Sequence, residues 1–73
     1  MELTIYQWRK VQDISQKKLA HAMGVHENTI RNWERHPEKL SAQKAEKIAE
    51  ALGVPLNNIL FGSTILQNVE EKS

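Results

Sequence analysis

Apolar residues recur three and four positions apart along most of the chain, which is the spacing of one face of a helix. Segments that alternate apolar and polar residues are nearly absent, so the pattern predicts an all-α fold of five short helices around one core. Thr4, Ser15 and Ser41 are suited to cap the starts of three helices. Gly24 and Gly53 are suited to end two of them, because glycine adopts the left-handed conformation at little cost.

The remaining boundaries follow from the two prolines. A third helix is expected to begin at His26 or Glu27 and to end before Pro37, which restricts the preceding residue away from helical angles. A fifth helix is expected over residues 55–61, because Pro55 suits a first helical turn.

Length and composition limit the class of protein. With 73 residues, 40% of them hydrophobic and 26% charged, the chain fits one small globular domain, which we expect over residues 1–62, with a polar tail over residues 63–73. Without cysteine there is no disulfide and no cysteine metal site, and we expect no metal, no other cofactor and no small-molecule ligand. No apolar run reaches the roughly 18–20 residues of a membrane span, and no signal peptide pattern is present, so we expect a cytoplasmic protein with no membrane partner.

Charge is unevenly distributed although the net charge is only +1. Residues 9–36 contain six Lys and Arg against three Asp and Glu, together with all three histidines. This asymmetry indicates an anionic partner or, alternatively, an ordinary solvated face. No glycine-rich phosphate loop and no acid pair in an apolar setting is present, so the sequence predicts no enzyme.

The most informative segment spans residues 16–35, where Gly24 joins two predicted helices. Ile30 and Trp33 would bury the back of the second helix. Its outward positions are all polar: His26, Glu27, Asn28, Arg31, Asn32 and Arg35. A helix with a buried back and a hydrogen-bonding front can enter the major groove of DNA.

Several motifs in this order resemble the phage lambda-type repressor and Cro helix-turn-helix family, also called the XRE family. The resemblance covers residues 3–60, about four fifths of the chain. It rests on Trp8-Arg9, residues 14–20, Met23-Gly24-Val25, residues 29–35, and residues 48–55 closing on Ile59-Leu60. It implies a small transcriptional regulator of phage or mobile-element type that binds a double-stranded DNA operator, with residues 26–35 as the recognition helix.

The resemblance also implies roles for individual side chains. The base-reading positions are Glu27, Asn28, Arg31 and Asn32, and the phosphate-contacting positions are Gln16, Lys17, His26, Thr29 and Arg35. Arg9 and Glu34 match a partly buried ion pair. Asn suits adenine, Arg suits guanine or phosphate, and Glu can accept from cytosine, although Glu27 could instead act only on the helix dipole. His36 stands where the family usually has glycine, so a different turn is expected there.

One such domain covers only a few base pairs, so we expect a weak homodimer. Leu56, Phe61 and Ile65 are the candidate contacts, because they are expected to leave apolar surface beyond what the core needs. Two alternatives remain open. One is an antitoxin that binds a toxin protein and autoregulates its operator, and the other is a helical module that binds only protein.

Overall fold

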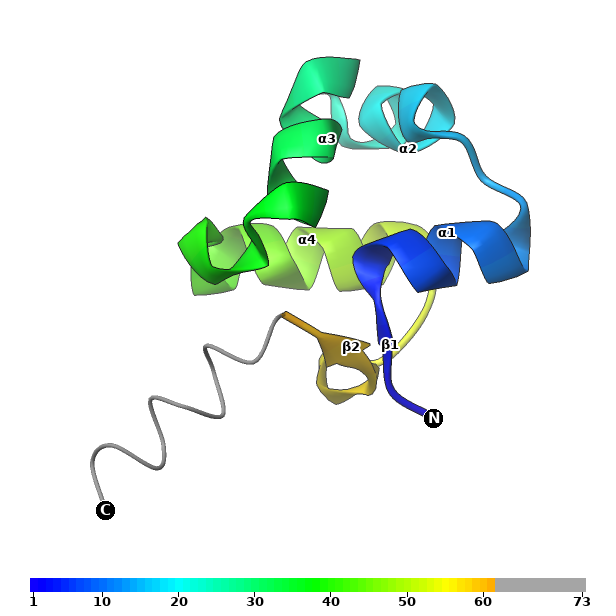
Figure 1. The fold of residues 1–73 in the computed structure, drawn as a ribbon, viewed down its shortest axis with the longest axis vertical. Coiled ribbons are helices and arrows are strands. Elements are labelled where there is room, and N and C mark those ends of the chain that lie inside the picture. The colour runs from blue at the N-terminus through cyan, green and yellow to red at the C-terminus, as the bar shows by residue number, and fades with distance from the viewer. Residues whose placement is uncertain (62–73) are drawn as a thin grey trace.

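The computed structural model describes residues 1–61, which form four α-helices, two 3-10 turns and one pair of very short strands (Figure 1). In chain order these are β1 (Leu3–Thr4), α1 (Ile5–Gln12), α2 (Gln16–Met23), α3 (Glu27–Arg35), η1 (Pro37–Lys39), α4 (Ala42–Leu52), η2 (Leu56–Asn58) and β2 (Ile59–Leu60). The α2–α3 unit lies on one side of α4, and the two strands lie on the other side. The predicted all-α fold class is confirmed.

Local caps set the helix boundaries, as the sequence predicts. Thr4 and Gln7 form a reciprocal capping box at the start of α1, with N–O distances of 2.9 and 3.1 Å. Ser15 and Ser41 accept from backbone N–H groups in the first turns of α2 and α4. Gly24 ends α2 with φ at 71°, in the left-handed region that disfavours other residues.

The segment after α3 takes a different turn, as expected from His36-Pro37. The helix ends at Arg35, and the N–H of His36 still donates to the carbonyl of Asn32 at 2.8 Å. Pro37 then opens η1, where its missing N–H costs no hydrogen bond.

The prediction of a fifth helix over residues 55–61 is wrong. The 3-10 turn η2 is followed by β2, which pairs in parallel with β1 so that Leu3 is opposite Ile59. Along this segment Ile59 and Phe61 are buried whereas Leu60 between them is 37% exposed. This alternation of buried and exposed residues is typical of a strand. The backbone groups of β2 find their hydrogen-bond partners in β1, whereas those of a helix would pair within the helix.

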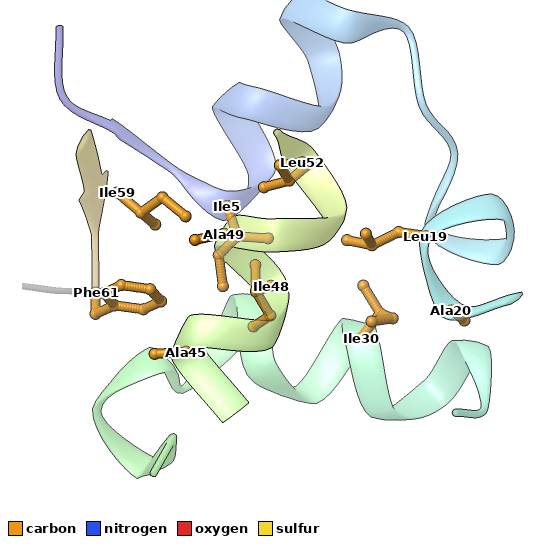
Figure 2. Close-up of a cluster of buried hydrophobic side chains, with 10 residues drawn as sticks. All are labelled: Ile5, Leu19, Ala20, Ile30, Ala45, Ile48, Ala49, Leu52, Ile59 and Phe61. Atoms are coloured by element: carbon orange, nitrogen blue, oxygen red, sulfur yellow. The ribbon is translucent and has the colours of Figure 1, made fainter. Parts of the chain in front are cut away.

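The core surrounds α4 (Figure 2). Ile48, at the centre of this helix, is completely buried, and Leu19 of α2 and Ile30 of α3 approach from the same side. Ile59 and Phe61 cover the opposite side. Because α4 contacts both groups, it connects α2–α3 to the β1–β2 end of the domain through apolar packing.

Candidate nucleic-acid interface

Small residues and a tight turn set the position of α3. Ala20 and Ile30 are buried where α2 and α3 meet, and the short side chain of Ala20 allows close approach. After Gly24, the N–H of Val25 donates to the carbonyl of Ala20 at 3.0 Å, which closes the end of α2. As a result, α3 crosses α2 at a steep angle, as Figure 1 shows.

A buried ion pair fixes the far end of α3. Arg9 of α1 binds the carboxylate of Glu34 through Nε and Nη2, and both side chains are less than a tenth exposed. The Nη1 of Arg9 donates to the carbonyl of Ile14 at 2.8 Å, and the side-chain amide of Gln16 donates to Glu34 at 3.0 Å. Three helices are thus joined by directional, charge-assisted bonds directly behind the polar face of α3.

Gln16 keeps hydrogen-bonding capacity beyond this network. Its Nε2 carries two N–H donors, of which Glu34 takes one. The second donor is available to an anion at the start of α2. The Gln16 side chain is therefore held by Glu34 and can still donate a hydrogen bond to an anion.

The polar face of α3 is present as the spacing predicts. Five of its side chains are exposed, namely Glu27, Asn28, Arg31, Asn32 and Arg35, and Thr29 beside them is half-buried. His26 is exposed at the start of the helix, where its side chain makes no cap hydrogen bond. Two contacts run along the face: Arg31 Nη1 donates to Asn28 Oδ1 at 2.9 Å, and Arg31 Nη2 lies 3.8 Å from Glu27 Oε2.

Basic side chains flank the start of α3. A shallow hollow of about 460 Å³ between the α1–α2 connection and Glu27 is lined by Lys10, Gln16 and Lys18 among others. A second hollow, of about 500 Å³, is lined by Lys17, Lys18, His21 and His26 among others. Lys18 lines both hollows, but the sequence interpretation missed it, although its place in the first turn after the Ser15 cap is a signal that could have indicated it.

Comparison with known proteins agrees with this geometry. A family model described as helix-turn-helix matches residues 5–59, which is most of the chain and includes all of α1 to α4. The chain belongs to the XRE helix-turn-helix family, of the lambda repressor and Cro-like type. No curated protein and no solved structure matches it significantly.

Membership of the XRE family makes this chain a DNA-binding transcriptional regulator. In the part of the chain that the structure describes, no cluster of three or more His, Asp or Glu side chains could hold a metal ion. Within that same part, no helix is long and apolar enough to cross a membrane.

The candidate dimer contacts of this XRE protein divide into three cases. Leu56 is 39% exposed and remains a candidate. The expectation that Phe61 leaves free apolar surface is wrong, because this residue is 7% exposed and its ring packs in the core next to Ile59 (Figure 2). Ile65 lies outside the described residues.

Proposed function

We propose that this XRE-family protein is a repressor- or Cro-like regulator that binds a specific double-stranded operator and places α3 in the major groove. The observation that supports this most strongly is the exposed polar face of α3, held from behind by the buried Arg9–Glu34 ion pair and the Gln16 amide bonded to it. Base recognition needs side chains held in a fixed position, because a base-pair edge is distinguished by the arrangement of its donors and acceptors.

The proposed contacts fall into two groups. The middle of the face, which would lie against the base edges, holds Glu27, Asn28, Arg31 and Asn32. Side chains at its margins contact phosphates: Gln16, Lys17, His26, Thr29 and Arg35. The margins carry the positive charge that sequence-independent attraction requires.

We also propose that two copies bind together, at half-sites about one helical turn apart. Leu56 of η2 and Leu60 of β2, each more than a third exposed, supply apolar surface, and β2 lies on the other side of α4 from α3. A contact there would leave both recognition helices free for DNA.

The deciding experiment is selection from a random duplex DNA library with the purified protein, repeated at two salt concentrations and read by sequencing. Enrichment of an inverted repeat would support operator binding by a dimer. Binding that disappears at the higher salt without an enriched sequence would contradict base recognition, and would favour a protein partner such as a toxin.

Two variants sharpen the result. Asn32→Ala is expected to lower affinity for the selected site by about 5- to 150-fold, the equivalent of 1–3 kcal/mol for one base contact, with little effect on unrelated DNA. Lys17→Ala is expected to weaken binding to all sequences and to reduce the salt slope by about one. Gln43→Ala, which removes an exposed amide on α4, is the matched control.

A further inference from the structure

The contacts along α3 show that its polar side chains are not equivalent. Arg31 turns toward the start of the helix, where it contacts Asn28 and Glu27. These residues precede it by three and four positions, the separations at which helical side chains meet. Arg35, one turn further on, forms none of the ion pairs found within residues 1–61, and it is also exposed.

We propose that Arg31 is the residue that selects a guanine in the operator, and that Glu27 and Asn28 position it rather than read bases themselves. This inference rests on the proposed function, because it assigns roles within the same interface. It gives Glu27 a third role, distinct from reading cytosine and from acting only on the helix dipole.

Hydrogen-bond capacity is consistent with this assignment. A guanidinium has five N–H donors. Here one points to Asn28 Oδ1 and one lies toward Glu27, so three remain. Guanine offers two acceptors in the major groove, N7 and O6, and a bidentate contact needs two donors. Arg31 can therefore hold both neighbours and still bind guanine through both acceptors.

The negative charge of Glu27 affects which DNA groups Arg31 can contact. A phosphate that approached Arg31 would also approach Glu27, and the two negative groups repel each other. The N7 and O6 atoms of guanine are uncharged acceptors, which the carboxylate repels far less. Glu27 therefore favours base contact over phosphate contact by Arg31, whereas Arg35, which has no carboxylate partner in the described part of the chain, suits a phosphate.

The difference between Arg31 and Arg35 gives the first test. In the library selection, the wild-type protein is expected to prefer guanine at one position of each half-site. Arg31→Ala is expected to lose that preference. Its affinity for the selected site is expected to fall by about 5- to 150-fold. Arg35→Ala is expected to weaken selected and unrelated DNA alike. If Arg31→Ala keeps the guanine preference, the proposal is wrong.

Glu27→Gln tests the positioning role. It is expected to raise affinity for unrelated DNA several-fold and to steepen the salt dependence by about one phosphate contact, because Arg31 is then free to bind phosphate. It is also expected to weaken the guanine preference. Glu46→Gln, which makes the same charge change at an exposed site on α4, is the matched control and is expected to change neither the salt slope nor the guanine preference. Equal effects of the two variants would overturn the proposal.

A modified base separates positioning from direct reading. Replacing the selected guanine with 7-deazaguanine removes the N7 acceptor and leaves the paired cytosine intact. This replacement is expected to lower the affinity of the wild type strongly and that of Arg31→Ala not at all. For Glu27→Gln and Asn28→Ala the decrease is expected to be smaller than for the wild type. If 7-deazaguanine lowers the affinity of Glu27→Gln as much as that of the wild type, Glu27 does not act through Arg31 and the proposal fails. If the wild-type protein enriches no sequence at all, it is the proposed function that fails.

Discussion

The two ends of this domain are stabilised by different chemistry. Behind α3 the contacts are polar and directional, with Arg9 and Glu34 buried together and Gln16 bonded to the same carboxylate. At the β1–β2 end, Ile59 and Phe61 are buried by apolar contact. Apolar burial depends on area and has no preferred direction, whereas hydrogen bonds fix angles. The end that carries the polar face of α3 is therefore the end with the buried, charge-assisted bonds.

The largest expected effect tests the polar end. Glu34→Ala leaves the guanidinium of Arg9 buried without a carboxylate, and is expected to lower the free energy of unfolding by about 3–5 kcal/mol. Urea denaturation followed by circular dichroism measures it. Glu46→Ala, at an exposed position, is the control and should change stability by about 0.5 kcal/mol or less.

A double variant shows whether the pair contributes orientation rather than stability. Arg9→Met combined with Glu34→Leu removes both charges and is expected to be more stable than Glu34→Ala. The same protein is expected to lose DNA selectivity, because α3 is no longer held by directional bonds. A double variant that kept full selectivity would contradict this account of the polar end.

The next largest effect tests the apolar end. Phe61→Ala is expected to cost about 3 kcal/mol, because it leaves a cavity in the core beside Ile59. Leu60→Ala, one residue away and 37% exposed, is expected to cost about 1 kcal/mol or less. Thermal unfolding at two protein concentrations measures both. A cost for Phe61→Ala that grew with protein concentration would instead assign the ring to a contact between copies.

A smaller effect concerns the bond that ties α1 to the apolar end. The indole N–H of Trp8 donates to the carbonyl of Asn58 at 2.9 Å. Trp8→Phe leaves this carbonyl without its donor and is expected to cost about 1–2 kcal/mol. Tyr6→Phe, on the exposed side of the same helix, is the control, with an expected change of about 0.5 kcal/mol or less. Equal costs in urea denaturation would show that the indole bond contributes nothing.

The smallest effect compares two left-handed helix ends. Gly24→Ala is expected to cost about 1 kcal/mol through backbone strain alone, because an added Cβ would meet no atom within 4 Å. Asp13 ends α1 with φ at 57°, so Asp13→Gly is expected to stabilise the domain by up to about 1 kcal/mol. Thermal melting that gave both changes the same sign would refute the strain argument.

The sequence predicted the helical part of the fold well because its signals are local. Thr4, Ser15 and Ser41 act within one helical turn of their own positions, and Gly24 needs only its own backbone conformation. The pairing of Leu3 with Ile59 is different, because backbone groups from distant parts of the chain form it and no side chain specifies it. A run of three residues is also too short for its alternation to be recognised as a strand.

For the candidate site, the sequence predicted which residues share a face but not the contacts between their side chains. Helical spacing alone places Asn28, Arg31 and Asn32 on one face, and the exposed face agrees. Spacing permits contacts between Arg31 and its neighbours but does not choose among side-chain rotamers, so the bond to Asn28 appears only in three dimensions. The place of Lys18 beside both hollows likewise depends on the angle between α2 and α3.

The parallel pairing of β1 and β2 has a mechanical consequence. Because both strands run in the same direction, the start of β1 and the end of β2 lie at opposite ends of the pair. A force that pulled on the chain before Leu3 and after Leu60 would therefore load the interstrand hydrogen bonds together, in shear, and could not open them one at a time. The shortest element of the domain is thus the one that would resist stretching first, while α2 and α3, which lie between these two points in the sequence, would stay folded until it gave way.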